Sequence, residues 1–277
     1  TGARIVRDGD GARLYDFATQ RAAQERLLAP YVTLPDGAIL PYIHPPFEAL
    51  LVAPLLGLSY GTLYLLWSGL ILLAFVGALA ALARALPLPG WPRWLLIAAL
   101  SSYHAISQAL WLGQSSPLVM LGLCASFLAL RRGREGWAGA ALALVAIKPQ
   151  LLLVVAPVLL LMGRWRTLAS CAAVLAGLSV AAMPALGPLW PLHYARFLAE
   201  INGWSGQTFI YPIVMHNWRG LALNLLGGVA PQLVGPAITL LTGVAGLTLL
   251  GAWWRARADV RGRAWGETSD LLLALAC

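Results

Sequence analysis

Long apolar runs separated by short polar segments dominate the chain. Residues 61–83 form the clearest run, with 23 residues and no charged side chain. A helix needs about 20 apolar residues to cross the hydrocarbon core of a bilayer, so we predict a membrane-spanning helix there. Further apolar helices are predicted at 94–111, 116–130, 137–147, 149–162, 167–186, 233–254 and from residue 271 onward.

Two of these runs are too short to cross a bilayer separately. Residues 137–147 number 11 and residues 149–162 number 14, and the pair Lys148-Pro149 separates them. A break in a helix at membrane depth is tolerated only where it is buried in protein or lines a water-filled cavity. The pattern therefore predicts a pair of half-depth helices with irregular backbone between them.

The composition excludes a soluble globular domain. Of the 277 residues, 60% are hydrophobic and 11% are charged, whereas soluble domains have roughly 25% charged residues. The three cysteines are scattered singly among apolar residues, so they form neither a disulfide framework nor a metal site. We predict an all-α fold, namely a polytopic bundle of transmembrane helices.

The formal net charge of +8 would also suit a protein that binds nucleic acid. The basic residues nevertheless follow the positive-inside rule if residues 1–60 lie outside the membrane. The inner loops then carry 11 of the 19 basic residues and four of the 11 acidic residues. The positive charge therefore reflects membrane topology, and we expect no nucleic-acid partner.

In this orientation the unusual polar clusters, as distinct from the arginine-rich inner loops, all lie on the outer face. They are residues 1–60, 113–116, 148–150 and 187–232. Their convergence predicts a site on this face, at the lipid interface.

We predict one domain, with an outer-face loop and interfacial helices at 1–60 and a transmembrane bundle at 61–277 that includes a long outer loop at 187–232. The sequence starts without Met and stops within an apolar run, so we expect a fragment lacking both ends of a longer protein.

Lys148 is the only lysine and lies between two apolar runs. An ionised side chain in such a place costs roughly 2.5–3.5 kcal/mol on insertion scales, so it needs a partner. An ammonium group beside the start of a helix suits a phosphate, because the free N–H groups of that helix end also attract anions. The alternative is that Lys148 extends from a helix end to the outer headgroups.

The densest polar and aromatic cluster is residues 211–220, in the last outer loop. His216 is a candidate acid, base or hydrogen-bond donor, and Arg219 is a candidate ligand of a phosphate. Asn217 lies between them and is a candidate substrate ligand. The alternative is a belt of interfacial side chains at headgroup level.

Two further outer segments carry candidate substrate-binding residues. Tyr42, His44 and Glu48 surround the pair Pro45-Pro46, just before the apolar stretch 49–58, which we expect to lie along the interface. A proline pair alternatively marks simple loop geometry. Gln114 interrupts two apolar runs, and either binds a sugar or phosphate or satisfies broken backbone groups.

The segment Asp8-Gly9-Asp10-Gly11 invites comparison with a calcium loop. Ala12 and Thr19 stand where an EF-hand requires oxygen ligands, so the segment departs from that pattern. We predict a turn with glycine at positive φ, and no metal site.

Taken together, these stretches resemble glycosyltransferase family 87, whose members are polytopic enzymes of the GT-C type. The resemblance covers nearly the whole chain and depends on the order of short motifs. These motifs are Thr1-Gly2-Ala3-Arg4, Gly11-Ala12-Arg13-Leu14-Tyr15-Asp16, His44-Pro45-Pro46-Phe47, Trp111-Leu112-Gly113-Gln114-Ser115-Ser116-Pro117, Ala138-Gly139, Ala146-Ile147-Lys148-Pro149-Gln150 and Met215-His216-Asn217-Trp218-Arg219-Gly220.

The resemblance implies a GT-C transmembrane bundle that transfers a sugar with inversion from a polyprenyl-phosphate donor. The acceptor would be a lipid or glycan hydroxyl on the outer side of a bacterial cytoplasmic membrane. Mannose is the expected sugar, and no cofactor is expected. Lys148 and Arg219 suit stabilisation of the leaving phosphate. The resemblance places the general base, an aspartate, upstream of Thr1, with His216 as the candidate within the chain.

Broken helices with a lone charge are also typical of transporters, so a transporter or flippase of a lipid-linked or anionic substrate remains the alternative. A transporter predicts an internal repeat, and we find none that aligns. The large outer segments favour the glycosyltransferase.

Overall fold

The computed structural model describes residues 1–31, 33, 39–85, 90, 91, 94, 95, 98, 99, 104–203 and 217–262. Within these residues the fold is helical, as the apolar pattern predicted, and three helices are long and apolar enough to cross a membrane. Those three stretches are Tyr60–Arg84, Trp165–Leu186 and Pro231–Ala252. The chain is therefore a polytopic helical membrane protein.

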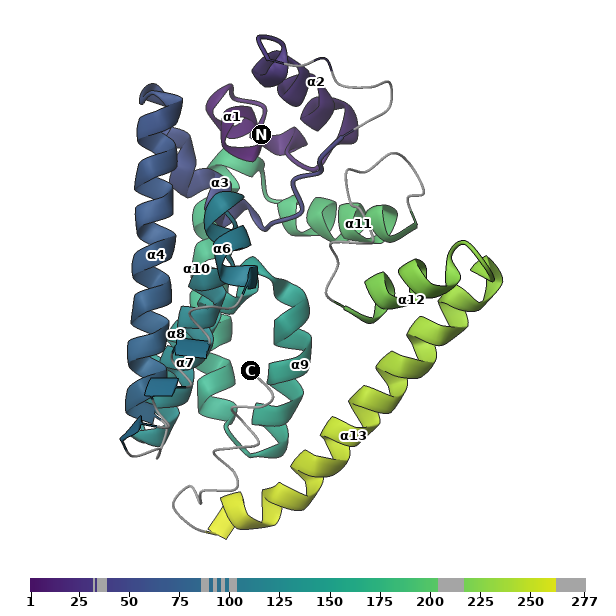
Figure 1. Cartoon of the computed structure of the whole chain (residues 1–277). Helices are drawn as coiled ribbons and strands as arrows, with labels where there is room; N and C mark the ends of the chain where they lie inside the picture. The colour runs from purple at the N-terminus through teal and green to yellow at the C-terminus, as the bar shows by residue number, and fades with distance from the viewer. Residues whose placement is uncertain are drawn as a thin grey trace.

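The central bundle is built from α4 (Tyr60–Ala85), α7 (Ser116–Arg131), α8 (Glu135–Leu142), α9 (Pro149–Leu161) and α10 (Trp165–Leu186). Helix α4 runs along one side of the bundle and packs on α7, while α8 packs between α7 and α10 (Figure 1). The core includes Leu123, Leu142 and Leu159, which are almost fully buried. These helices match the predicted runs at 61–83, 116–130, 137–147, 149–162 and 167–186.

The predicted break is present at Lys148. The first short helix continues from α8 into the 3-10 helix η3 (Ala143–Ile147), and α9 starts with Pro149 at its first position. Lys148 has φ −123° and ψ 79°, outside helical geometry. Proline lacks the N–H group that a helix interior needs, so it suits the first turn of α9.

The first 57 residues form a cap of short helices on one end of the bundle: α1 (Gly2–Arg7), η1 (Gly11–Arg13), α2 (Phe17–Leu28), α3 (Pro46–Val52) and η2 (Ala53–Gly57). The predicted turn is confirmed, because Gly9 has φ 86° while Leu14 and Tyr15 are buried. Asp16 caps α2 by accepting a hydrogen bond from the Thr19 N–H group at 2.9 Å.

The segment predicted as a long outer loop contains two helices, α11 (Trp190–Gly203) and α12 (Trp218–Leu226). Trp190 and Phe197 of α11 are buried, while Arg196 and Glu200 of the same helix are exposed. This helix is therefore amphipathic rather than apolar. A search for spanning runs overlooks such helices. The 3-10 helix η5 (Pro231–Leu233) then leads into α13 (Val234–Gly262).

The predicted run at 94–111 is described mainly in α6 (His104–Trp111), and the run from 271 lies outside the described residues.

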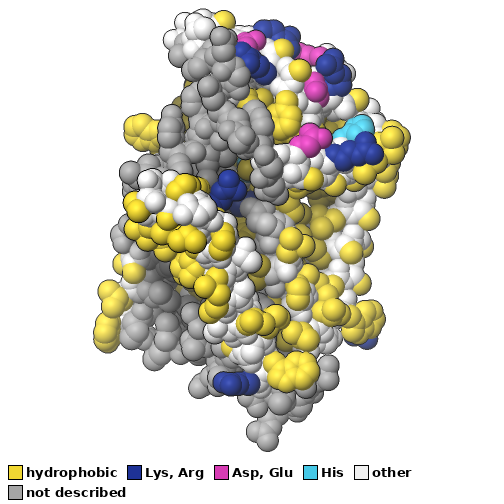
Figure 2. All heavy atoms as spheres, turned by 90° about the vertical axis from the view of Figure 1, so that its right-hand side faces the viewer, with side chains coloured by type: hydrophobic (Ala, Val, Ile, Leu, Met, Phe, Trp, Pro, Cys, Tyr) yellow, Lys and Arg dark blue, Asp and Glu magenta, His cyan; other side chains and the backbone are white. Residues whose placement is uncertain are grey.

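The two ends of the molecule differ in their side chains. The ends of α4, α7 and α9 and the start of α10 lie opposite the cap of short helices (Figure 1). Arg84, Arg131, Arg164 and Arg166 belong to these ends. Figure 2 shows the acidic and histidine side chains at the upper end together with several basic ones, and below them a broad hydrophobic surface with isolated basic side chains. This separation agrees with the grouping of loops on which the predicted orientation depends.

Two buried glutamines of α2 hold the extended segment 39–42 against the cap. Gln20 donates to the Leu14 carbonyl at 2.8 Å and accepts from the Tyr42 N–H group at 2.7 Å. Gln24 accepts from the Leu40 N–H group at 3.0 Å. Their amides act as the partners that a neighbouring strand would otherwise supply.

Replacing Gln20 with alanine should therefore destabilise the cap. The Leu14 carbonyl and the Tyr42 N–H group would both lose a partner in a buried place, at a cost of about 2–4 kcal/mol. Thermal unfolding of the solubilised protein measures this change. Arg21→Ala is the matched control, because its hydrogen bond to Glu25 is exposed and an exposed pair contributes about 0.5 kcal/mol. An equal effect of both substitutions would contradict the role of Gln20.

Candidate functional site

Three segments that are distant in the sequence line one pocket of about 230 Å³, which we call the lysine pocket. Ile43 and His44 come from the chain before α3, and Gln114 comes from the turn between α6 and α7. The break between η3 and α9 contributes Ile147, Lys148, Pro149 and Gln150. Three predicted site residues, His44, Gln114 and Lys148, thus lie together.

The turn that carries Gln114 is held by the first long helix. Gly113 has φ 62°, a conformation that favours glycine, and its carbonyl accepts a hydrogen bond from Trp67 Nε1 of α4 at 2.7 Å. The Gln114 N–H group donates to the Ala109 carbonyl at 2.7 Å and so closes the end of α6. The exposed Gln114 side chain is left at the rim of the pocket.

Lys148 is half-buried at the start of α9. Its Nζ donates a hydrogen bond to Ser116 Oγ, at the start of α7, at 2.7 Å. The positive end of the α9 dipole lies at the same point, so the ammonium group and the helix both favour an anion there. This is the combination that the sequence predicted for a phosphate contact.

Glu48 of α3 is not among the lining residues of the lysine pocket but contacts two of the segments that form it. Its Oε2 accepts a hydrogen bond from Ser115 Oγ at 3.3 Å and lies 3.2 Å from His44 Nδ1. That nitrogen is buried and is not aligned for a regular hydrogen bond. Glu48 therefore joins the segment before α3 to the turn before α7. The third segment is joined through Ser116, the neighbour of Ser115, which accepts the hydrogen bond from Lys148.

Tyr42 supports the pocket without lining it. Its hydroxyl donates to the Pro45 carbonyl at 3.0 Å and accepts from the Ala49 N–H group at 3.1 Å. Burial raises the pKa of Tyr42 well above its ordinary value, so the phenol stays neutral. Its ring centroid lies 5.8 Å from that of His44. Tyr42 thus fixes the Pro45-Pro46 corner that presents His44.

Asn217 and Arg219 are not among the described residues that line this pocket. Asn217 caps α12, because its Oδ1 accepts a hydrogen bond from the Gly220 N–H group at 2.8 Å. Arg219 is exposed in the first turn of α12 and does not line the lysine pocket. His216 lies outside the described residues.

Sequence reasoning offered Glu48, with His44, as a residue that could line a site, but it did not predict the contact of Glu48 with Ser115. The available signal was its position four residues after His44, at the start of a helix. Its contact with Ser115 spans 67 residues of sequence, so no local pattern could have revealed it.

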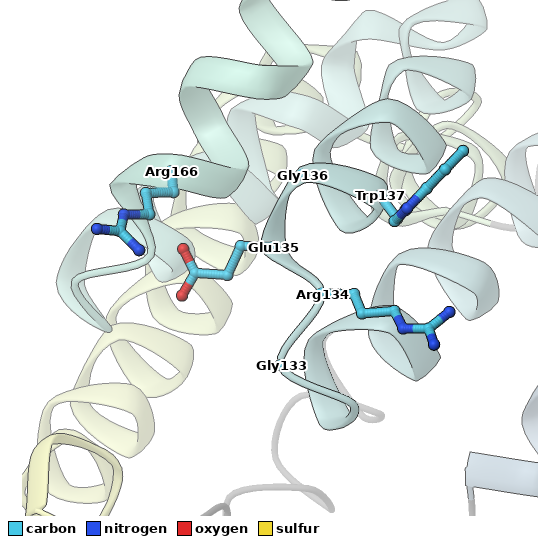
Figure 3. A pocket seen from close by; sticks show the side chains of 6 residues that line it. All are labelled: Gly133, Arg134, Glu135, Gly136, Trp137 and Arg166. Atoms are coloured by element: carbon cyan, nitrogen blue, oxygen red, sulfur yellow. The ribbon is translucent and has the colours of Figure 1, made fainter.

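A larger pocket, of about 550 Å³, lies where α8 and α10 begin. In Figure 3, Arg134 and Arg166 lie on either side of Glu135 and do not converge on a common point. Glu135 instead accepts a hydrogen bond from Arg164 Nη1 at 3.0 Å, and Trp137 is exposed. Arginine with exposed tryptophan is typical of a membrane–water interface. We therefore take the lysine pocket as the candidate active site.

The side chains that line the lysine pocket suit an anion that also carries polar groups. Lys148 supplies a cation, and the amides of Gln114 and Gln150 can donate and accept hydrogen bonds. Among the described residues, no group of three or more His, Cys, Asp or Glu side chains is placed to hold a metal ion.

Comparison with known proteins identifies the family. Searches of curated proteins and of solved structures gave no match. The sequence model of glycosyltransferase family 87 matches residues 42–276. This range includes the residues that line the lysine pocket. It leaves out the first 41 residues, which contain two of the short motifs. The chain therefore belongs to glycosyltransferase family 87 and is a membrane glycosyltransferase.

Proposed function

We propose that this glycosyltransferase uses a polyprenyl-phosphate sugar as donor and binds the donor phosphate in the lysine pocket. The sugar, expected to be mannose, is transferred to a hydroxyl of a lipid or glycan acceptor. The observation that carries this proposal is the position of Lys148, which is half-buried at the start of α9 and hydrogen-bonded to Ser116. A lipid-linked phosphate needs a cation close to the apolar part of the protein, and Lys148 lies between two apolar helices.

The transfer forms a bond between the acceptor oxygen and C1 of the sugar, and it breaks the bond between C1 and the phosphate oxygen. Polyprenyl phosphate leaves with the bonding electron pair, and the acceptor hydroxyl loses its proton to a general base. Lys148 would stabilise the charge on the leaving phosphate. The base expected from the family resemblance is an aspartate preceding Thr1, with His216 as the candidate in this chain.

We further propose that residues 1–60, which contain the cap, face the outside of a bacterial cytoplasmic membrane, in one domain with the bundle at 61–277. The concentration of arginine at the opposite end of the bundle supports this orientation. Membrane lipids would surround the apolar helices, and the donor would enter the lysine pocket from the outer leaflet.

The test uses the full-length protein in membrane vesicles supplied with polyprenyl-phosphate-[¹⁴C]mannose. Covalent transfer of the label to endogenous lipid or glycan acceptors is expected, and vesicles without the protein serve as the control. The same sugar on a nucleotide should not be a donor. If the labelled lipid moves across the membrane without covalent transfer, the transporter or flippase alternative is correct instead.

A further inference from the structure

A third pocket, of about 400 Å³, lies between the η1–α2 corner of the cap and α11. We call it the cap pocket. Its polar lining residues are Arg13, Asp16, His193, Arg196 and Glu200. Tyr15 and Phe197 also line it, with ring centroids 5.6 Å apart, and both are buried. The volume lies within the range of roughly 300–1,000 Å³ that is usual for small-molecule sites.

The charges of the cap pocket are balanced. Among the described residues, its lining includes two arginines, two carboxylates and His193, and the hydrogen bonds from Thr19 lower the pKa of Asp16. Such a lining offers donors and acceptors side by side, which suits a neutral ligand with many hydroxyl groups. An anion would meet Asp16 and Glu200 as well as the arginines, and it would gain little net attraction. Figure 2 shows basic, acidic and histidine side chains close together at this end of the molecule.

A thin wall separates the cap pocket from the lysine pocket. Tyr15, which lines the cap pocket, donates a hydrogen bond to the His44 carbonyl at 3.1 Å. Tyr194 of α11 donates to the Ile43 carbonyl at 3.1 Å, and its ring centroid lies 4.9 Å from that of Tyr15. Ile43 and His44 line the lysine pocket. The two pockets thus share one layer of residues.

We propose that the cap pocket binds a neutral sugar unit of the acceptor, next to the donor site. This rests on the proposed function. A sugar unit held by Arg196, Glu200 and Asp16 would anchor the acceptor. A neighbouring unit of the same acceptor would extend past the wall and bring its hydroxyl next to the donor sugar. The acceptor class that fits is a glycan or glycolipid with an uncharged sugar unit close to its reacting end.

The test measures transfer from polyprenyl-phosphate-mannose with the full-length protein in vesicles, using a total lipid extract of the host membranes as acceptor. Arg196→Ala and Glu200→Gln should each raise the apparent KM for the extract about tenfold or more, because each removes a charged hydrogen-bond partner. The KM for the donor should stay within about twofold, which also shows that the variants are folded. Arg26→Ala is the control, as an exposed arginine of the cap outside this pocket.

Competition distinguishes the chemistry of the ligand. Methyl α-mannoside should compete with the lipid extract in the wild-type protein and compete less in Glu200→Gln. Competition by inorganic phosphate but not by the glycoside would overturn the proposal, and so would a rise in donor KM or an unchanged acceptor KM. Absence of transfer by the wild-type protein would instead refute the proposed function on which this site depends.

Discussion

Replacing Lys148 with methionine is expected to reduce sugar transfer about 100- to 1,000-fold, comparable with the loss of one charge-stabilising donor in other enzymes. Methionine keeps much of the length of the side chain but removes the one lysine or arginine among the described residues that line the lysine pocket. The leaving phosphate would then develop its charge without a cation within this pocket. Initial rates in vesicles, normalised to the amount of inserted protein, measure the effect.

Two comparisons separate this role from a structural one. Lys148→Arg should keep part of the activity, because the charge is retained while the hydrogen bond to Ser116 is altered. The amount and thermal stability of Lys148→Met should not fall, since removing a half-buried charge from between apolar helices relieves a cost. Transfer by Lys148→Met within about threefold of wild type would refute the role proposed for the lysine.

Replacing Gly139 with alanine is expected to destabilise the bundle by about 3 kcal/mol or more. A Cβ atom on Gly139 of α8 would meet the Thr167 carbonyl oxygen, and it would lie 2.6 Å from Ser170 Cβ and 2.7 Å from the Cys171 nitrogen of α10. Most of these atoms belong to the backbone of α10 and cannot move aside. The two helices would have to separate, and the surrounding core would lose its packing.

The same helix offers a matched control. A Cβ atom on Gly136 would meet nothing within 4 Å, so Gly136→Ala should be neutral or slightly stabilising. For Gly139→Ala, thermal unfolding of the solubilised protein should shift downward by roughly 5–10 °C. Equal melting temperatures for the two variants would show that the contact between α8 and α10 is not tight. Because α8 leads through η3 to Lys148, we also expect Gly139→Ala to lose activity.

The structure gives a physical reason for Ala138-Gly139, one of the short motifs that resembled the family. Small residues let two membrane helices approach closely, and Ala138 is fully buried beside the glycine. The sequence alone could not identify α10 as the partner helix, because η3 and α9 lie between α8 and α10 in the chain.

Part of the candidate site could be predicted because its signals are local. Lys148 is a charge between apolar runs, Pro149 ends one helix and begins the next, and the polar residues 113–116 interrupt two apolar runs. These features depend on a few neighbouring residues. The lysine pocket contains the predicted residues His44, Gln114 and Lys148, whereas Asn217 and Arg219 lie on α12, outside it.

The sequence by itself determined the helical class, the long apolar spans and the break at Lys148, because apolar length and proline geometry act within one segment. Only the tertiary structure decided which segments meet. Glu48 reaches Ser115 across 67 residues and Tyr194 reaches Ile43 across 151, and the cap pocket exists only because α11 folds back onto the η1–α2 corner. Such contacts arise from the packing of whole helices, which no periodicity along a single segment encodes.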